Sequence, residues 1–390
     1  MTLPSPARLS PKAALLNREE VRYVAAEWDN LAEQASEPNS FYERWFLEPS
    51  LGHLDPPDSL KILTVRDGTG VLIGLLPLRT GRTYGRTRIA AVENWLHYNQ
   101  FLGAPLVLRG AEHKFWETAL PLIDQTVSAN ILYLSEMPSD SAVTRALFDV
   151  CRRKRRPNAI VHRYTRALLV AGETADAYWA STVRKKKRKE IARLENRLAE
   201  MGVIRIETLR SLDGADAWLA AFLDLEARGW KGKDGAALAL EASHSAFFRD
   251  ALRTALGMGR AEIVRLTCGD DVIAMLVNFL AGAGSFSFKI AYDERYARFS
   301  PGILIEKANL QRLNDPAFGW MDSCAVENHP MINSLWRYRR EMVRIALPLA
   351  GMKSAMLFRA ARAAETSWST IKQLRTRSTP KETQVHHDEL

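Results

Sequence analysis

The stretch Glu262-Ile-Val-Arg-Leu266, which leads through turn residues into the apolar run Asp271–Leu280, decides the fold. Two apolar runs joined by Gly and Asp residues predict a β-hairpin. The same pattern occurs in the first half of the chain, where Lys61-Ile-Leu-Thr-Val65 leads through Asp-Gly into Val71–Leu78. Each hairpin follows a helix-period segment with large aromatic residues. A helix–hairpin unit that occurs twice indicates a duplicated architecture.

The second half can be followed element by element from its periodicity and its turn residues. The pattern predicts a long charged helix at Asp176–Met201, an amphipathic helix at Asp213–Gly229, a strand at Ser285–Tyr292, a helix that begins at Pro301 with Ser300 as its N-cap, a strand at Gly319–Ala325, a helix at Met331–Arg340 and a last strand at Met342–Leu347. Strands separated by single helices imply a mixed, partly parallel sheet. We therefore predict an α/β (α+β) fold in which each half is a mixed central sheet flanked by helices.

The composition is that of an ordinary globular protein. The 390 residues are 47% hydrophobic and 25% charged, and at roughly 150 residues a domain they suffice for two or three domains. Cys151, Cys268 and Cys324 are too scattered for a disulfide framework or a zinc site, so we expect a cytoplasmic protein without a metal. No apolar stretch approaches the ~20 residues of a membrane-spanning helix.

The positive charge is concentrated in one part of the chain. Residues 151–200 hold 15 Lys and Arg against five Asp and Glu, an excess of 10, whereas the whole chain carries +9. Six consecutive cations repel one another unless an anion relieves them. We therefore expect a polyanion contact, with a solvated helix face as the alternative, at Arg184, Lys185, Lys186, Lys187, Arg188 and Lys189. No nucleic-acid-binding module accompanies these cations, so we expect no sequence-specific DNA binding.

The segment Lys289-Ile-Ala-Tyr-Asp-Glu-Arg-Tyr-Ala-Arg-Phe-Ser-Pro-Gly302 resembles the GNAT-related acetyltransferases of the CelD (cellulose biosynthesis) type. Gly229-Trp-Lys-Gly232, Asp322-Ser-Cys-Ala325 and Trp336 carry the same resemblance. It covers about residues 21–347 and is strongest in the second half. That family is similar to the Fem-type aminoacyl transferases, which also fuse two GNAT-like halves.

The resemblance implies two tandem GNAT-like acyl-CoA N-acyltransferase halves. We expect a flexible N-terminus over residues 1–20, a degenerate half over 21–165, an acetyltransferase half over 166–350, and a C-terminal helix with a disordered tail over 351–390. The implied activity moves an acetyl or other acyl group from acyl-CoA to an unidentified amine or hydroxyl acceptor, in envelope or exopolysaccharide metabolism. Two alternatives are an aminoacyl-tRNA-dependent, Fem-like ligase and a non-enzymatic scaffold of a polysaccharide synthesis complex.

The predicted helix start at residues 300–302 is the candidate donor site. The N-terminus of a helix offers unpaired N–H groups and a positive dipole end to a phosphate. The family's usual Gln/Arg-x-x-Gly-x-Gly/Ala motif is replaced here by Arg298-Phe-Ser-Pro-Gly-Ile-Leu304, so we expect an altered mode of donor binding, with a plain N-cap as the alternative. The expected contacts are the side chains of Arg298 and Ser300 and the main-chain amides of Gly302, Ile303 and Leu304.

Acceptor and catalytic residues are expected near the ends of the two strands that flank this helix. Ligands collect at the C-terminal ends of strands in α/β sheets, which suggests Lys289, Tyr292 and Asp293 on the first strand and Asp322 on the second. Asp293 is also a candidate Asx-turn residue. Acyl transfer to an amine needs a base, for which Asp322 and Tyr292 are candidates.

Glu226 is a third candidate base, because it lies close to the apolar stripe of its helix, where partial burial would raise its pKa. A structural pairing with Lys231 or Arg228 is the alternative role for this carboxylate. The remaining candidates for binding the acceptor are Trp230, Lys231, His329 and Trp336. Cys324 has no accompanying His or Asn partner and is expected to be a small buried residue rather than a nucleophile.

Overall fold

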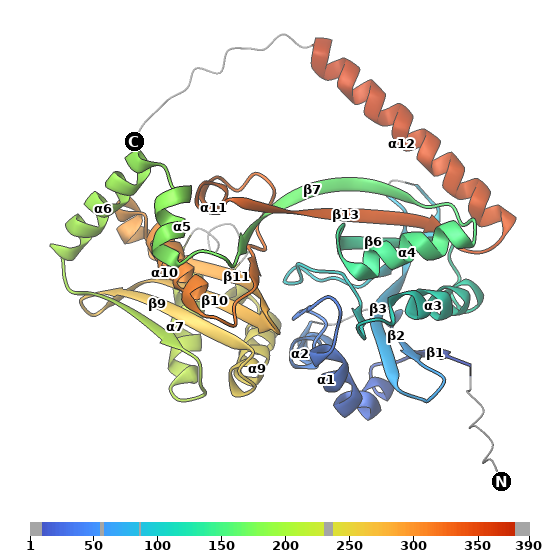
Figure 1. The fold of residues 1–390 in the computed structure, drawn as a ribbon, viewed down its shortest axis with the longest axis horizontal. Helices are drawn as coiled ribbons and strands as arrows, with labels where there is room; N and C mark the ends of the chain where they lie inside the picture. Colours follow the sequence, from blue (N-terminus) through green and yellow to red (C-terminus); the bar gives the residue numbers. More distant parts are fainter. Residues whose placement is uncertain (1–9, 55–57, 86, 230–236, 379–390) are drawn as a thin grey trace.

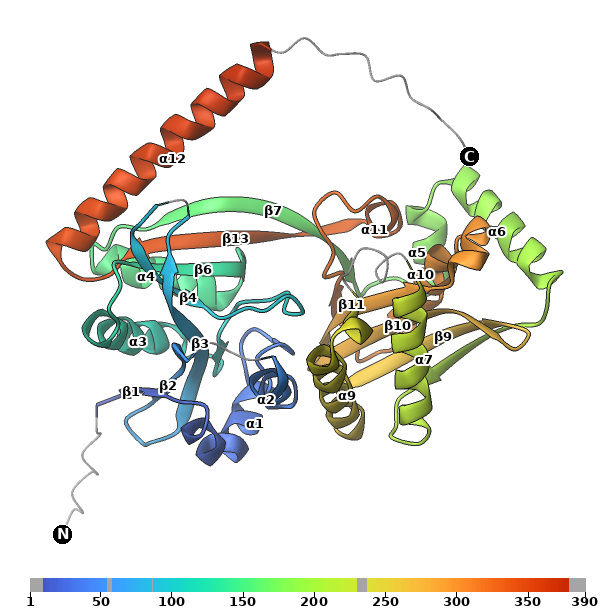
Figure 2. The same cartoon turned by 180° about the vertical axis from the view of Figure 1, so that it is seen from behind.

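One continuous mixed sheet runs through the whole molecule, with helices packed on it in each half (Figures 1 and 2). The computed structural model describes residues 10–54, 58–85, 87–229 and 237–378, with side chains described up to residue 365. Within these residues the 13 strands follow the order β1-β2-β3-β4-β6-β13-β7-β12-β11-β10-β9-β8, and β5 pairs with β3. The predicted mixed sheet with flanking helices is confirmed.

The N-terminal half begins the sheet at one edge. Its strands are β1 (Lys12–Leu16), β2 (Leu60–Arg66), β3 (Leu72–Thr83), β4 (Ala90–Asn94), β5 (Leu106–Val107), β6 (Ile131–Pro138) and β7 (Ala159–Val170), and its helices are η1 (Glu20–Val24), α1 (Ala25–Glu33), α2 (Arg44–His53), α3 (Glu112–Thr126) and α4 (Ala142–Arg153). The predicted hairpin is β2 and β3. We expected residues 1–20 to be flexible, but β1 pairs with β2, since Leu15 and Leu16 pack against the core.

The C-terminal half begins at the opposite edge of the sheet and repeats the succession of an edge strand, two helices and a hairpin. Its helices are α5 (Ala175–Thr182), α6 (Lys185–Ala199), α7 (Ala215–Arg228), η2 (Leu238–Leu240), α9 (Ala242–Gly257), η3 (Glu294–Phe299), α10 (Pro301–Asn309), η4 (Leu310–Asn314) and α11 (Pro330–Leu335), and its strands are β8 (Ile204–Leu209), β9 (Ala261–Cys268), β10 (Asp271–Ala281), β11 (Gly284–Tyr292), β12 (Trp320–Asp322) and β13 (Tyr338–Pro348). Helix α12 (Met352–Ser378) then extends away from the body (Figure 2). Among the described residues, no helix combines the length and the apolar character needed to cross a membrane.

Two predicted helices of this half differ from the structure. The helix predicted at Asp176–Met201 is divided into α5 and α6, because the buried Val183 and the following Arg184 are extended, with ψ of 123° and 139°. The helix predicted at Met331–Arg340 ends at Leu335, because the chain from Tyr338 onward is taken into the ladder with β7.

The two halves exchange their last strands. β13, the last strand of the C-terminal half, pairs with β6 of the N-terminal half. β7, the last strand of the N-terminal half, pairs with β12 of the C-terminal half, and β7 and β13 pair with each other. The boundary that we placed between residues 165 and 166 therefore falls inside β7, and each half needs a strand from the other to complete its part of the sheet.

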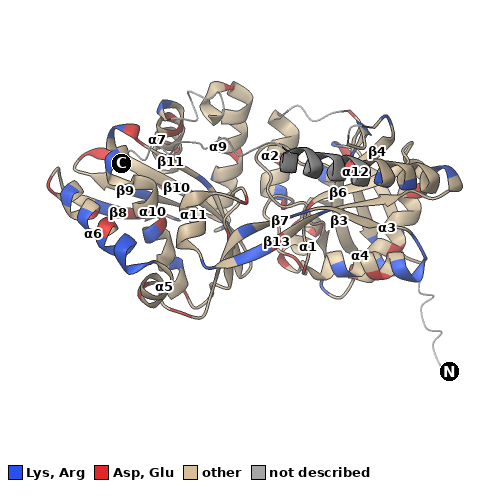
Figure 3. Cartoon of the chain, turned by 90° about the horizontal axis from the view of Figure 1, so that it is seen from above, with Lys and Arg blue, Asp and Glu red and all other residues tan. Residues whose placement is uncertain are grey.

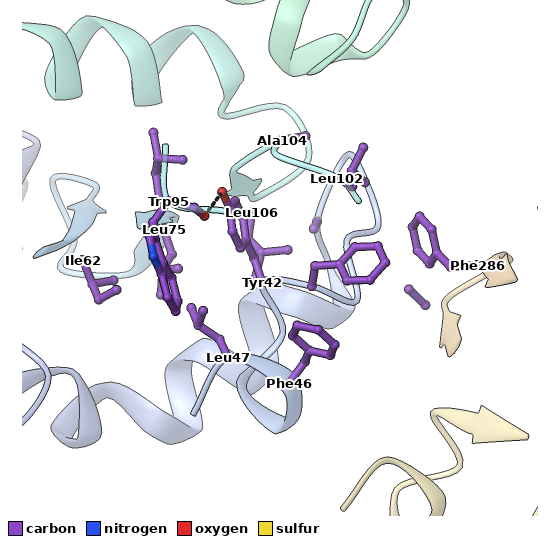
Figure 4. Packing of buried hydrophobic residues seen from close by; sticks show 14 of the residues in the cluster. Tyr42, Phe46, Leu47, Ile62, Leu75, Trp95, Leu102, Ala104, Leu106 and Phe286 are labelled. Carbon is purple, nitrogen blue, oxygen red and sulfur yellow. Dashed lines mark hydrogen bonds between the residues drawn. The ribbon is translucent and has the colours of Figure 1, made fainter. Parts of the chain in front are cut away.

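An aromatic cluster joins the two halves beneath the exchanged strands. Phe41 lies in edge-on contact with Phe286 of β11, at 5.1 Å between ring centroids, and Phe46 contacts Phe279 of β10 at 5.7 Å. These four rings are all buried, and Figure 4 shows Phe46 and Phe286 approaching from the two sides. Since aromatic pairs contribute about 0.5–1.5 kcal/mol beyond the burial of their area, the halves share one core.

A buried group of charged side chains lies where the exchanged strands cross. Arg166 of β7 and Arg340 of β13 are opposite each other in the antiparallel ladder. Asp322 of β12 is fully buried, and its Oδ2 lies 2.9 Å from Arg166 Nη2 and 3.8 Å from Arg340 Nη1. Glu37 pairs with Arg340 from the other side. Two like charges placed opposite each other would destabilise the ladder, so Asp322 and Glu37 make this crossing possible.

A second buried carboxyl group, that of Glu306, lies inside the C-terminal half. Glu306 is on α10 and is 3% exposed. Its carboxyl group accepts hydrogen bonds from Asn309 Nδ2, at 3.4 Å, and from the Ser287 side chain of β11. Burial raises the pKa of Glu306 to about 7, so this group is protonated in the folded protein under mildly acidic conditions.

Replacing Arg166 by Met tests the buried charges at the crossing. The variant leaves Asp322 buried without its 2.9 Å partner, and we expect a loss of about 3–5 kcal/mol in the free energy of unfolding, measured by urea denaturation. Arg163→Met is the matched control, because Arg163 lies on the same strand and forms an exposed pair with Glu341, for which we expect a loss below about 1 kcal/mol. Equal losses in the two variants would contradict the account.

Replacing Glu306 by Gln tests the burial of its carboxyl group. Between pH 4.5 and about 7 the unfolded carboxyl ionises while the folded one stays protonated, so the wild-type protein loses stability as the pH rises through this window. A shift from 4.5 to about 7 corresponds to about 3 kcal/mol, all of which is lost above pH 7. Gln cannot ionise. The free energy of unfolding of the variant, relative to the wild type, should therefore rise by this amount from pH 4.5 to 8, and a constant difference would refute the assignment.

Candidate functional site

The N-terminus of α10, which we predicted as the donor site, has fewer free amides than expected. The helix begins at Pro301 as expected, and Ser300 before it is left-handed, with φ 54° and ψ 53°. The Ser300 side chain does not cap the helix. Instead the Ser300 carbonyl oxygen accepts the amides of Ile303 and Leu304, at 2.9 and 3.2 Å. Of the three donors that we predicted, only Gly302 is not bonded to this carbonyl.

A basic groove lies beside this helix start. It has a volume of 430 Å³ and is lined by Arg184, Lys186, Lys187, Glu190, Ile191, Leu194, Ser300 and Ile303. The cationic run and the predicted donor site, which are more than 100 residues apart in the sequence, therefore share one cavity. Figure 3 shows the basic residues concentrated on α6. Three cations against one carboxylate make the groove electropositive.

The first turn of α6 adds to this positive potential. Arg184 is its N-cap, no side chain caps it, and its first turn contains no acidic residue. The first-turn amides of a helix point out of its N-terminus, where cations are destabilised by the dipole. Lys187 is held in place by a 2.5 Å hydrogen bond from its Nζ to Ser334 Oγ of α11, and burial lowers its pKa. The groove thus combines two helix N-termini with three cationic side chains.

The arginines that precede α10 lie on its outer side. Arg295 donates to Asp293 from its main chain and its guanidinium, at 2.9 and 2.7 Å, which holds the pKa of Asp293 below its usual range. Asp293 is therefore the Asx-turn residue that we considered, because its carboxylate accepts the amide of the residue two positions on. Arg298 is exposed and stacks on Phe299 at 4.7 Å. It does not line the groove.

The end of β11 brings a charged pair to the junction between the halves. The ladder with β10 shifts register at Phe288, which is an extra residue opposite Val277 and Asn278. Such a bulge re-aims the side chains that follow it. Lys289, 8% exposed, lies with its Nζ 3.8 Å from Glu226 Oε1 of α7. Among the described residues, Lys289 thus lies beside Glu226, whereas Lys231, one of the two cations that we considered for a structural pairing, lies outside them.

The surroundings of Glu226 show how this carboxylate is held. Its second oxygen, Oε2, accepts the amide of Leu238 at 2.9 Å. Arg228 points elsewhere and pairs with Asp224. Trp230 and Lys231, which we predicted to line the acceptor pocket, lie outside the described residues.

Tyr292 lies close to the start of α10. It ends β11 and is partly exposed. A Cβ atom placed on Gly302 would lie 3.9 Å from Tyr292 Cδ1 and 3.3 Å from Met331 Sδ. A methyl group at Gly302 would therefore need only a small shift of the Met331 side chain, whereas a bulky side chain would displace Met331 and crowd Tyr292.

Four other predicted residues are structural in their placement. Asp322 is buried in the charged group described above, and its Oδ1 accepts the amide of Cys324 at 2.9 Å, so neither oxygen is available to an acceptor. Burial, followed by Asp322, raises the pKa of the Cys324 thiol well above its usual value, which disfavours a nucleophilic thiolate. His329 caps α11 through Nδ1, which accepts the amide of Ile332 at 3.4 Å. Trp336 is 1% exposed and packs in the core.

The N-terminal half contributes two residues that sequence reasoning missed as site residues. Tyr98 is 71% exposed, and Lys289 Nζ lies 5.6 Å from its ring centroid. His97 precedes it and is fixed by Ser50 Oγ, at 3.0 Å from its Nε2, and by stacking on Phe46. Burial lowers the pKa of His97 to about 3, so it is neutral and anchors the loop that carries Tyr98. The sequence signal that could have identified these residues is the His97-Tyr98-Asn-Gln segment.

The corresponding helix start in the N-terminal half differs in its side chains and in the backbone beside it. Helix α3 follows β4 there as α10 follows β11, and its first turn carries Glu112, which is 8% exposed and accepts the amide of Gly110 at 3.1 Å. Between the ends of β4 and β6, Gly103 donates to the Glu136 carbonyl at 2.8 Å, and Asn94 Nδ2 donates to the Gly103 carbonyl at 3.0 Å. The start of α3 thus carries a buried carboxylate that α10 does not have.

The comparisons with known proteins agree with this geometry. Residues 185–324 match the family model of an acetyltransferase (GNAT) domain. FemX superposes with a TM-score of 0.56 at 9% identity, covering 86% of this chain and 96% of FemX. The C-terminal domain (DUF2156) of a putative lysylphosphatidylglycerol synthetase from Agrobacterium fabrum gives a TM-score of 0.52 at 8% identity, covering 87% and 96%. A conserved protein of unknown function from Bacteroides thetaiotaomicron gives 0.50 at 12% identity, covering 84% and 97%.

At these identities the structural likeness shows the fold alone. No curated protein sequence matches the chain, and the comparisons contain nothing that points to the CelD type. The GNAT resemblance itself is confirmed, as is the fold of two GNAT-like halves. Residues 185–324 thus match the GNAT acetyltransferase domain, within a chain whose overall fold is similar to that of FemX.

Proposed function

We propose that this protein is an acyltransferase whose donor is an acyl-CoA, with the donor phosphates bound in the groove between α6 and the start of α10. The observation that carries the proposal is the meeting of two helix N-termini and three cations in one 430 Å³ groove. Helix N-termini favour phosphates through their free amides and their dipoles, and Lys and Arg add charge-assisted hydrogen bonds.

The energetics of α6 support an anionic ligand. Five lysines and arginines fill its first five positions, at the end of the helix where the dipole opposes positive charge. Their mutual repulsion and the dipole both lower the stability of the empty groove. The negative charge of a pyrophosphate would offset both the repulsion and the unfavourable dipole. A helix face that only meets solvent would have no need for so many cations at this end.

The donor would run from this groove past Gly302 to the end of β11. Tyr292 and Met331 border that path. The acyl group would then reach the junction of the halves, where Lys289 and Glu226 form a buried pair under Tyr98. A GNAT-type reaction joins the acceptor nitrogen or oxygen directly to the acyl carbon and releases the thiol.

We assign the role of base to Glu226, in preference to the two other candidates. Asp322 is tied to Arg166 at 2.9 Å where β7 and β13 cross, whereas the Lys289 cation lies 3.8 Å from Glu226 and next to the exposed Tyr98. Tyr292 lies on the donor side of β11, where it would orient the donor. Glu226, held by Lys289 and the Leu238 amide, would take the proton that the acceptor amine or hydroxyl loses on attack.

The N-terminal half would serve the acceptor and not a second donor. Glu112 and the segment around Gly103 fill the place that corresponds to the donor groove, and Tyr98 from this half reaches the Lys289–Glu226 pair. The resemblance to CelD-type proteins favours an envelope or exopolysaccharide precursor as the acceptor.

An aminoacyl-tRNA donor is the second candidate. The observation in its favour is that Lys185 and Lys189 are exposed outside the groove, so the basic surface of α6 is wider than one pyrophosphate requires. A tRNA backbone would use such a surface, and its affinity would then fall steeply as the salt concentration rises.

Calorimetric titration with acetyl-CoA and longer acyl-CoAs tests the donor site. We expect the wild-type protein to bind, and Lys186→Glu to weaken binding by about tenfold or more, because a charge-assisted contact becomes repulsive. Gly302→Trp should abolish binding, since its side chain would displace Met331 and Tyr292. Arg152→Glu is the matched control, because it reverses an exposed cation on α4, which does not line the groove, and should leave the affinity unchanged.

Two outcomes would reject the acyl-CoA proposal. Equal weakening by Lys186→Glu and Arg152→Glu would show a non-specific charge effect. An absence of binding to every acyl-CoA, together with salt-sensitive binding of aminoacyl-tRNA, would replace the proposed donor by the second candidate. Melting curves of each variant show whether a loss of affinity reflects a loss of folding.

A further inference from the structure

Strand β8 ends the sheet with an open edge. It occupies the last place in the strand order and, among the strands of the described residues, pairs with β9 alone. The Gly269 amide donates to the Val203 carbonyl at 2.9 Å, and these residues are opposite each other in the register that continues into β8. Because hydrogen-bonded and outward-facing residues alternate in an antiparallel ladder, Arg205 and Glu207 bond to β9, whereas the main-chain groups of Ile204, Ile206 and Thr208 face outward.

The edge is unusually apolar for a solvent-exposed strand. Of the 13 exposed large hydrophobic residues in the described part of the chain, four lie within residues 201–212, and they are Met201, Val203, Ile206 and Leu212. Ile206 is 54% exposed and borders two adjoining grooves of 350 and 320 Å³. Natural edge strands are commonly protected by Lys, Pro or a bulge. The sequence of β8, Ile-Arg-Ile-Glu-Thr-Leu, and its unbroken register with β9 contain none of these.

The residues of β8 are complementary to a second copy of themselves. In an antiparallel pair centred on Ile206, each Arg205 lies opposite the Glu207 of the other copy. Ile206 then faces its twin, and Ile204 faces Thr208. The pairs 206–206 and 204–208 are the ones whose main-chain groups face outward, so register and hydrogen bonding agree. Opposite charges and apolar residues placed directly across a ladder stabilise it.

We propose that two copies of this chain associate through β8, antiparallel and centred on Ile206, so that their sheets join into one. The symmetry of the arrangement is that of a closed dimer, in which the same surface serves both partners. The proposal is independent of the acyltransferase function, because β8 forms the sheet edge and the donor groove lies between α6 and α10.

A second copy fits this edge better than an unrelated extended peptide. The order Arg205, Ile206, Glu207 places opposite charges at equal distances on either side of a central apolar residue. Only self-pairing uses that arrangement, because it brings both charge pairs together by one twofold operation. An unrelated peptide would pair with the outward-facing main-chain groups of β8, but its binding would not require Arg205 and Glu207 to be placed symmetrically about Ile206.

Sedimentation equilibrium of the full chain tests the proposal. The wild type should be a dimer at micromolar concentration. Arg205→Glu and Glu207→Arg should each raise the dissociation constant by about tenfold or more, because each turns both charge pairs into like-charge pairs. An equimolar mixture of the two variants should restore dimers. One variant carries carboxylates at positions 205 and 207, and the other carries guanidinium groups at both positions. Each pair across the ladder of the mixed dimer therefore joins opposite charges again.

The mixture separates a specific contact from damage to the fold. Glu207→Arg also removes the exposed pair with Arg265 of the same chain, but a misfolded variant would not recover on mixing. Arg152→Glu again serves as a control with the same change of charge as Arg205→Glu, and should remain dimeric. A wild-type monomer, dimers that both reversals leave intact, or a mixture that stays monomeric would each overturn the proposal.

Discussion

Strands β7 and β13 exchange places between the two halves, and their pairing puts Arg166 and Arg340 opposite each other. That arrangement holds only because Asp322 and Glu37 bring negative charge to the same buried point. The exchange fixes how the halves lie against each other, and the aromatic cluster of Phe41, Phe46 and their partners then seals the junction. The Lys289–Glu226 pair meets Tyr98 of the other half at this same junction.

The two halves share an architecture but differ in the one place where a donor would bind. In the C-terminal half, the helix that follows the parallel strands begins with Ser-Pro-Gly and faces three cations. In the N-terminal half, the corresponding helix begins with a buried glutamate, and a glycine segment fills the space between the strands. A carboxylate at a helix start complements the helix dipole and disfavours a second anion there, which supports the proposal of a single donor site in the C-terminal half.

Local chemistry made much of this predictable from the sequence. The hairpins followed from apolar runs around Gly and Asp, and the start of α10 followed from Ser300-Pro301, because both signals act within a few residues. The burial of Asp322 could not be predicted, since its partner Arg166 is 156 residues away in the chain and arrives only through the strand exchange. The bulge at Phe288 and the break at Val183 were also missed. Both depend on which partner the backbone finds in the folded protein. The contact between α6 and α10 was not predicted for the same reason. The cationic run and the Ser-Pro-Gly helix start were each recognised in the sequence, but the sequence did not indicate that they lie side by side.

Hydrogen–deuterium exchange of the full chain with and without acyl-CoA tests most directly whether a single donor site exists at the start of α10. The account predicts that the ligand slows exchange in residues 184–190 and 300–306 and leaves residues 110–116, at the start of α3, unchanged. Slower exchange at the start of α3 on addition of the ligand would contradict the account. So would unchanged exchange in both α6 and α10.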